Sequence, residues 1–104
     1  MSIKVFQKRI LDKLGLYIRK LRESAELPLR KLAASLDIDQ STLSKIERGE
    51  RQFTSDMIPK LAKVFSVEYK DLQIMFLKEK LLKDISNQAF AQEALLELQK
   101  ELKD

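Results

Sequence analysis

The sequence predicts an all-α protein, and three features carry that prediction. The 104 residues include only two glycines and two prolines, so the chain is poor in loops and strands. Alanine, leucine, lysine and glutamate, which favour helices, are abundant. Apolar residues recur at the i, i+3, i+4, i+7 spacing that gives a helix one apolar face.

Two helices are expected before the first proline. One runs from about Ile3 to Lys13. The next continues to about Ser24, and Gly15 either separates the two helices or is absorbed into the second. Their apolar faces are formed by Ile3, Phe6, Ile10 and Leu14 in the first helix and by Leu14, Ile18, Leu21 and Ala25 in the second.

Two short helices joined by a tight turn follow Pro28. Residues 37–38 form the turn, and Asp39 is a suitable N-cap for the second of these helices. That helix runs from Gln40 to about Glu47, and Gly49 can end it in the left-handed conformation. The first helix has its apolar positions at Leu29, Leu32, Ala33 and Leu36.

Further helices are expected in the second half of the chain. Thr54 or Ser55 is expected to cap the first of them. A longer helix runs from near Tyr69 to about Lys83, and a break at residues 86–87 separates it from a last helix, roughly Gln88 to Lys103. The first of these helices places Ile58, Leu61, Ala62 and Phe65 on its apolar face.

The net charge of +4 is distributed unevenly along the chain. Residues 1–72 carry 15 lysines and arginines against 10 acidic residues, which is a net charge of +5. Residues 73–104 carry 5 against 6, which is −1. A basic front part favours contact with a polyanion, and the nearly neutral tail indicates a different role.

The composition excludes several classes of function. There is no histidine and no cysteine, so the commonest general base and the imidazole and thiolate metal ligands are missing. The carboxylates are scattered among lysines and arginines, as on solvated helix faces. We therefore expect no enzymatic activity, no cofactor and no metal site. No apolar run approaches the roughly 20 residues that span a bilayer, and the first residues lack a secretion signal, so we expect a cytoplasmic protein.

The segment from Leu27 to Arg51 carries the functional prediction. Two short helices at this spacing are typical of a helix-turn-helix, whose second helix lies in the DNA major groove. On that helix Leu43 and Ile46 point inward. Its outer face has no acid and no large apolar side chain, and it consists of Gln40, Ser41, Ser44, Lys45 and Arg48. Each of these can hydrogen-bond a base edge or a phosphate, whereas an ordinary solvated face usually carries glutamate as well.

Two charged residues occupy apolar faces. Arg22 lies on the stripe of its helix among Ile18 and Leu21, and Glu47 lies beside Leu43 on the inner side of its helix. Opposite charges that both face inward are expected to pair. We therefore expect a largely buried ion pair between Arg22 and Glu47 with a structural role.

The stretch LGLYIRKLRESAELPLRKLAASLDIDQSTLSKIERGERQF, followed by MIPKLAKVFSVEYKDL, resembles the Cro/repressor-type (XRE) helix-turn-helix family. The resemblance covers about residues 14–72, and its most specific part is LSKIERGER with the upstream LRES and KLA. It implies a five-helix repressor-type bundle in which helices two and three form the motif. The expected pair of Arg22 and Glu47 matches a buried ion pair typical of the family.

The same resemblance assigns roles to surface residues. It places base contacts at Gln40, Ser41, Ser44 and Lys45, and DNA-backbone contacts at Thr42, Arg48 and Arg51. The chain departs from the family at Leu29, where a phosphate-binding glutamine is usual, so Arg30 or Lys31 is expected to make that contact. It also has Asp37 where the turn usually has glycine, and aspartate tolerates the left-handed region better than most residues.

The predicted domains are an N-terminal helical extension (1–13), the DNA-binding domain (14–72) and C-terminal helices for dimerisation (73–104). In the tail, Leu72 and Phe76 can face the bundle. A second apolar stripe, which a small domain does not need, is formed by Ile74, Leu77, Leu81, Ile85, Phe90, Leu95, Leu98 and Leu102. Such stripes usually mark an interface, so a homodimer is expected, and the alternative is a tail folded back onto its own bundle.

The sequence therefore predicts a sequence-specific transcriptional regulator, a repressor or autoregulator, that binds a palindromic operator in double-stranded DNA as a homodimer. No small-molecule ligand is expected. The sequence is similar to those of restriction–modification controllers and phage-type repressors. The alternative is an antitoxin or adaptor module whose C-terminal helices bind a partner protein.

Overall fold

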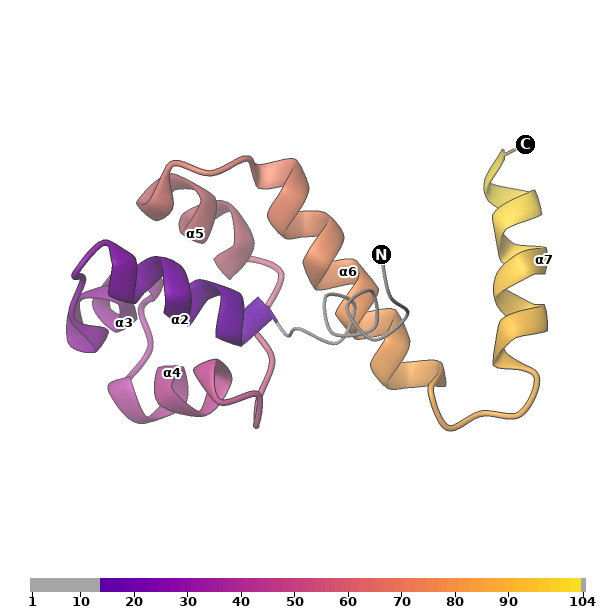
Figure 1. Cartoon of the computed structure of the whole chain (residues 1–104), viewed down its shortest axis with the longest axis horizontal. Helices are drawn as coiled ribbons and strands as arrows, with labels where there is room; N and C mark the ends of the chain where they lie inside the picture. The colour runs from indigo at the N-terminus through magenta and orange to yellow at the C-terminus, as the bar shows by residue number, and fades with distance from the viewer. Residues whose placement is uncertain (1–13, 104) are drawn as a thin grey trace.

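The computed structural model describes residues 14–103, which form helices joined by short connections (Figure 1). The helices are α2 (Leu14–Ser24), α3 (Leu29–Leu36), α4 (Gln40–Glu47), α5 (Met57–Phe65), α6 (Tyr69–Ile85) and α7 (Ala91–Lys103). These described residues contain no strand, which confirms the all-α prediction for them. The helix expected from Ile3 to Lys13, and with it the extension over 1–13, lies outside the described residues.

The helices of the bundle are short because left-handed residues stop them. The residues with positive φ at these ends are Glu26 (53°), Asp37 (58°), Gly49 (82°) and Ser66 (52°). After α5, for example, the amide of Val67 donates to the carbonyl of Ala62 at 3.1 Å, which satisfies a carbonyl that the helix leaves unpaired. The turn after α2 also takes up Ala25, which is exposed rather than part of the apolar face.

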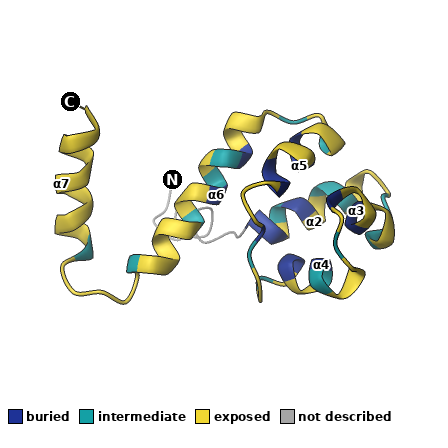
Figure 2. Ribbon diagram, turned by 180° about the vertical axis from the view of Figure 1, so that it is seen from behind, coloured by how far each residue is buried: buried dark blue, intermediate teal, exposed yellow. Residues whose placement is uncertain are grey.

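The apolar faces of α2 to α5 and of the first half of α6 meet in one core (Figure 2). Helix α2 packs against α4 and α6, α3 packs against α4 and α5, and α5 packs against α6. The largest fully buried side chains are Ile18, Leu32, Leu43, Ile58, Leu61 and Leu72. Helix α7 stands apart from this bundle and has no buried residue (Figures 1 and 2).

The last two helices and the break between them are present as predicted, but their bounds differ by two or three residues. Helix α6 continues to Ile85 instead of ending near Lys83, and α7 begins at Ala91 instead of Gln88. Phe90, directly before α7, has a φ of 64° and therefore turns the chain in the left-handed region. Because phenylalanine rarely adopts that conformation, nothing in the sequence indicates this turn.

The expected cap of α5 is also wrong. Asp56 precedes the helix, and no side chain there makes a capping hydrogen bond. The Thr54 hydroxyl instead donates to the Asp56 carboxylate, and this hydrogen bond lowers the pKa of Asp56. The amide of Met57 is satisfied by the carbonyl of Thr54 at 3.1 Å, so a backbone bond replaces the side-chain cap.

Within residues 14–103, no helix combines the length and the apolar character that crossing a membrane requires. The same residues contain no group of three carboxylates placed to hold a metal ion.

Candidate nucleic-acid interface

A three-residue turn (37–39) sets α4 at an angle to α3. Asp37 adopts the left-handed conformation there, as expected at a position where the resemblance implies glycine. The amides of Asp37 and Ile38 donate to the carbonyls of Ala34 and Ala33 at 3.1 and 3.0 Å. The turn is therefore closed by backbone bonds, and its length is that of a helix-turn-helix.

Asp39 fixes the first turn of α4. Its Oδ1 accepts a hydrogen bond from the amide of Thr42 at 2.6 Å, which is the N-cap geometry expected from the sequence. This backbone hydrogen bond is the main reason why the pKa of Asp39 is lowered, and the charges of Lys45 and Arg51 act in the same direction. The carboxylate also lies at the positive end of the helix dipole, where a negative charge is stabilising.

The two sides of α4 differ sharply in exposure. Leu43 and Ile46 are buried in the core. On the other side, the residues assigned to base contact are Gln40, Ser41 and Lys45, which are exposed, and Ser44, which is half-buried. Thr42, assigned to the DNA backbone, is half-buried as well. The described residues of α4 thus present a polar outer face without an acidic side chain.

The outer face ends in a small polar cluster, Ser44, Arg48 and Glu50. One Nη of Arg48 donates to the Ser44 hydroxyl at 2.7 Å, and Nε of Arg48 donates to Glu50 Oε2 at 2.9 Å. The sequence prediction assigned Arg48 to DNA and did not include Glu50. Spacing along α4 does not reveal this partner, because Glu50 lies beyond the helix, after the turn at Gly49.

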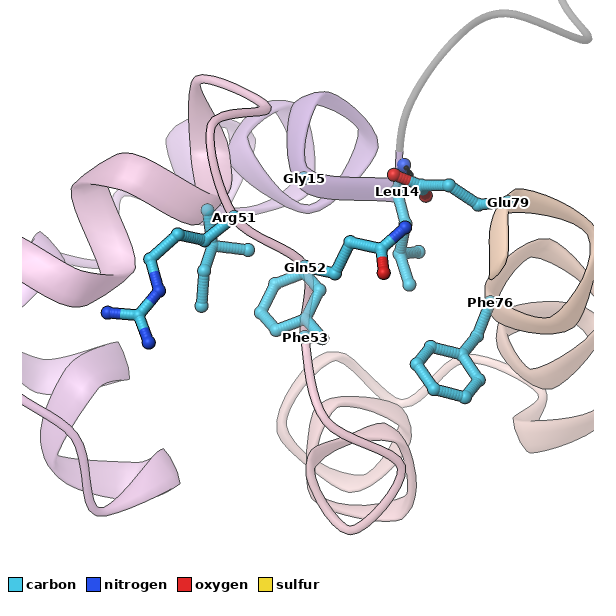
Figure 3. Close-up of a pocket in the computed structure, with 8 residues that line it drawn as sticks. Leu14, Gly15, Arg51, Gln52, Phe53, Phe76 and Glu79 are labelled. Atoms are coloured by element: carbon cyan, nitrogen blue, oxygen red, sulfur yellow. Dashed lines mark hydrogen bonds between the residues drawn. The ribbon is translucent and has the colours of Figure 1, made fainter. Parts of the chain in front are cut away.

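The C-terminal end of α4 lies very close to α2 (Figure 3). A Cβ atom on Gly15 would lie 2.0 Å from the carbonyl oxygen of Ile46 and 3.2 Å from the Cα of Glu47. The neighbouring atoms are backbone, which cannot rotate away, so only glycine allows this approach. Gly15 lies inside α2 rather than separating two helices, and its lack of a side chain allows α2 and α4 to pack this closely.

Helix α6 contacts the same end of α2. The Leu14 amide donates to Glu79 Oε2 at 3.0 Å, which gives the first turn of α2 an acceptor from α6 (Figure 3). The first turn of α2 has no acidic residue of its own. Sequence reasoning missed this contact because the two residues are 65 positions apart.

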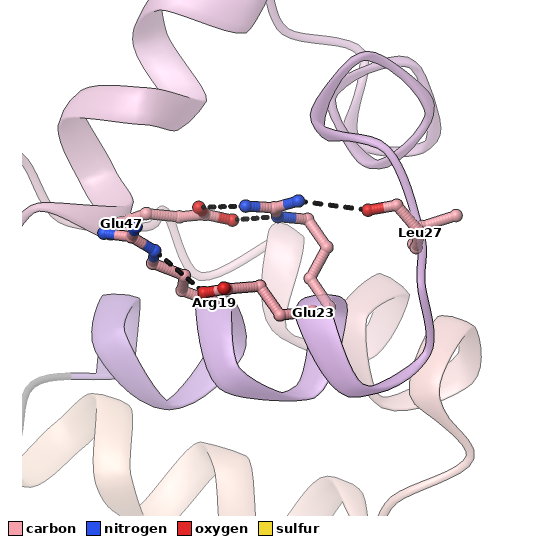
Figure 4. Close-up of polar contacts among 5 residues, drawn as sticks. Arg19, Glu23, Leu27 and Glu47 are labelled. Atoms are coloured by element: carbon pink, nitrogen blue, oxygen red, sulfur yellow. Dashed lines mark hydrogen bonds and ion pairs between the residues drawn. The ribbon is translucent and has the colours of Figure 1, made fainter.

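The structure brings Arg22 and Glu47 together in a two-bond ion pair (Figure 4). Nε and one Nη of Arg22 donate to the two carboxylate oxygens of Glu47 at 2.8 and 3.0 Å. The other Nη donates to the carbonyl of Leu27 at 3.1 Å. The Glu47 side chain is only 4% exposed and that of Arg22 15%. The hydrogen bonds to Glu47 are the main reason why the pKa of Arg22 is raised.

The comparisons with known proteins agree with this geometry. The helix-turn-helix family HTH_3 matches residues 18–72, which is more than half of the chain and runs from α2 into α6. The chain belongs to the XRE-type helix-turn-helix family of DNA-binding transcriptional regulators. By their order and the tight turn between them, α3 and α4 correspond to the two helices of the motif. Helix α4 corresponds to the second one, called the recognition helix, which in helix-turn-helix proteins lies in the major groove.

Two relatives are similar to part of the chain. They are uncharacterized HTH-type transcriptional regulators of Mycobacterium tuberculosis, one from strain CDC 1551 / Oshkosh and one from strain ATCC 25618 / H37Rv. Each is 33% identical over 60 residues, which are 58% of this chain and 43% of the relative. The matched part is thus less than half the length of these relatives. No solved structure is significantly similar to the chain.

The remaining cations assigned to the DNA backbone flank the helix-turn-helix. Arg30 and Lys31 are exposed in the first turn of α3, beside the half-buried Leu29. Arg51 is exposed in the connection that follows the recognition helix. Arg30 and Lys31 therefore lie at the helix start where the family usually has its phosphate-binding glutamine, although at neighbouring positions.

The apolar stripe assigned to dimerisation lies on α6, α7 and the connection between them. Of its residues, Ile74, Leu77 and Leu81 are 45–50% exposed and Ile85 is half-buried. The remaining residues, Phe90, Leu95, Leu98 and Leu102, are 37–79% exposed. Leu72 and Phe76 of α6 instead face the helix-turn-helix bundle and are buried. Among the described residues, the stripe thus remains much more exposed than the core.

Proposed function

We propose that the chain binds a palindromic operator in double-stranded DNA as a homodimer and represses transcription, including that of its own gene. The outer face of the recognition helix carries this proposal. Within α4 this face is polar, mostly exposed and without an acidic side chain, and the helix is fixed at both ends. Asp39 caps its start, and the Arg22–Glu47 pair together with Gly15 seats its end against α2.

The residue types on this face suit direct readout of base pairs. The Gln40 amide can donate to and accept from the edge of adenine, and Lys45 can donate to O6 and N7 of guanine. Both are exposed and project from the first two turns of the helix, the part that reaches base edges in this family. The Ser44 hydroxyl already accepts a hydrogen bond from Arg48, so its own proton remains for a base or phosphate oxygen.

Cations around the recognition helix supply affinity that does not depend on sequence. Arg48 and Arg51 follow the helix, and Arg30 and Lys31 precede it on α3. Thr42, on the helix itself, adds a neutral hydroxyl. Each phosphate neutralised by a cation releases counterions, so the logarithm of the binding constant falls by about 0.9 per contact for each decade of salt. Affinity for any duplex is therefore expected to fall steeply as salt rises.

The stripe on α6 and α7 supports the dimer, with a second copy of the chain as its occupant. Both helices present exposed leucines, and within one chain α7 stands away from the bundle (Figure 1). In a two-fold dimer each copy supplies the same two faces, so α7 of one copy can cover α6 of its partner and the reverse. Such a dimer carries two recognition helices, which is what the half-sites of a palindrome require.

The same stripe supports a second candidate function, an antitoxin or adaptor module whose tail binds a different protein. The two candidates differ in the state of the isolated chain. A homodimer sediments as a dimer at micromolar concentration, with or without DNA. A chain that stays monomeric under both conditions favours the partner-protein function.

The experiment that tests the proposed function is selection from a library of random duplexes, followed by sequencing, at two salt concentrations. We expect a palindromic motif whose enrichment persists at the higher salt. Binding that is lost at the higher salt and shows no preferred sequence at the lower one would contradict the proposal.

A further inference from the structure

Glu50 places a negative charge at the cationic end of the recognition helix, where repulsion from DNA phosphates would be strongest. Its carboxylate does not point away from the helix. A single oxygen, Oε2, accepts hydrogen bonds from Nε of Arg48 at 2.9 Å and pairs with an Nη at 2.8 Å. The other Nη of Arg48 donates to the Ser44 hydroxyl at 2.7 Å.

The position of Glu50 is set by the end of α4 itself. The amide of Glu50 donates to the carbonyl of Lys45 at 2.9 Å, and that of Gly49 donates to Ile46 at 3.0 Å. Together with the φ of 82° at Gly49, these bonds make the two-bond helix ending that fixes the next two residues. The backbone that carries the Glu50 side chain is therefore fixed to the end of the recognition helix.

The pair is too exposed to matter much for stability. The side chain of Arg48 is 52% exposed and that of Glu50 is 58% exposed, and ion pairs of this kind add little to the free energy of unfolding. What the contacts do is hold a long side chain in one place. An arginine that is already ordered loses less conformational entropy when it binds a ligand than a free one does.

We infer that Glu50 is a positioning residue for DNA binding, which holds Arg48 ready for one backbone phosphate at the end of the recognition helix. Arginine has five N–H donors, of which Glu50 and Ser44 occupy three. Two donors remain for the phosphate. The inference rests on the proposed function, because it requires α4 to face DNA.

A charge effect and a positioning effect predict opposite results for Glu50→Ala. If Glu50 only repels DNA, its removal tightens binding and makes the salt dependence steeper. If it positions Arg48, its removal weakens binding to the selected duplex, roughly 3- to 10-fold, and makes the salt dependence shallower by up to about one unit. Glu50→Gln keeps an acceptor oxygen in place, so we expect it to retain most of the affinity that Glu50→Ala loses.

The experiment is a fluorescence-anisotropy titration of the duplex selected above, at several salt concentrations, with the full chain. Glu50→Ala is measured alone and together with Arg48→Ala. Glu23→Ala is the matched control, because Glu23 is also an exposed acid paired with an arginine, Arg19 at 2.9 Å, but on α2. Thermal unfolding of each variant verifies that all of them fold like the wild type.

The inference holds if Glu50→Ala weakens binding in the wild-type background and has no further effect once Arg48 is alanine. It is overturned if Glu50→Ala tightens binding, or if it weakens binding equally in both backgrounds. A wild-type chain that selects no sequence at all overturns the proposed function, and this inference with it. A wild type that does select a motif leaves the proposed function standing whatever Glu50 does.

Discussion

Arg22 and Glu47 bring two charges into the packing between α2 and α4. The Glu47 carboxylate is almost completely removed from water and receives two N–H groups from Arg22. A buried pair of this kind adds modestly to stability in itself, because desolvation of the charges offsets most of their attraction. Its larger effect is on geometry, since both partners are satisfied only when α4 is seated at one angle.

Removal of one partner therefore tests the pair. Arg22→Met leaves the Glu47 carboxylate buried without a cation, and the free energy of unfolding is expected to fall by about 3–5 kcal/mol. Urea denaturation measures this loss. Arg19→Met is the matched control, because its ion pair with Glu23 is exposed and should contribute no more than about 1 kcal/mol. An equal loss in the two variants would show that the buried pair contributes no more to the free energy of unfolding than the exposed one.

Asp39 connects pH to the start of the recognition helix. Its pKa is lowered in the folded chain by the Thr42 amide, so the charged form stabilises the fold. That stabilisation is complete above the ordinary aspartate value and is lost as pH falls through the lowered pKa. Asp39→Asn keeps a capping oxygen but does not titrate, so the wild type should lose its advantage over this variant as the solution is acidified. Thermal unfolding across the acid range measures the difference, and a constant gap at every pH would contradict the account.

At the scale of helices, the contact between α2 and α4 depends on one residue without a side chain. Gly15→Ala would improve helix propensity, but the added Cβ overlaps the Ile46 carbonyl. We expect a net loss of about 1–3 kcal/mol in the free energy of unfolding. Lys20→Ala, at an exposed position of the same helix, should change it by less than about 0.5 kcal/mol. Gly15→Ala protein as stable as the wild type would show that α2 and α4 can separate freely.

Much of the bundle can be predicted from the sequence because its signals are local. The apolar spacing around Leu32 and around Leu43 extends over a few residues of each helix. The cap at Asp39 and the turn at Asp37 are equally local. The contacts of Gly15 and Glu79 cannot be predicted in this way, since they join segments whose distance only the folded chain defines. The contact of Glu50 with Arg48 is local, but it depends on how the chain turns at Gly49. For Glu50 a weak signal existed, an acid two residues after an arginine at a helix end.

For the tail, too, the sequence predicts only part of what the structure shows. The apolar periodicity of α6 and α7 predicts a stripe, and the stripe residues Leu81 and Leu98 are exposed in the single chain. Periodicity does not show what covers these sides. The start of α7 was misplaced for a related reason, because the left-handed turn at Phe90 has no sequence signature.

At the scale of the whole molecule, the proposed homodimer depends on the apolar stripe of α6 and α7. Leu81→Lys places a charge in the centre of the exposed stripe and should weaken dimerisation at least about tenfold, because the charge would have to be desolvated. Leu81 is 47% exposed in the isolated chain, so the fold itself should be little affected. Sedimentation velocity at micromolar concentration measures the change. Lys80→Ala, also on the exposed surface of α6, is the control, and an unchanged dimer in Leu81→Lys would remove the stripe from the interface.

The central claim is that the outer face of α4 reads DNA sequence, and the double variant Gln40→Ala/Lys45→Ala tests it most directly. Selection from random duplexes with this variant, at the two salt concentrations used for the wild type, compares the preferred motifs. We expect the variant to fold normally, because both side chains are exposed, and to lose or relax the motif while it retains salt-dependent binding. A variant that selects the same motif with the same stringency would contradict the claim and assign sequence recognition to another part of the chain.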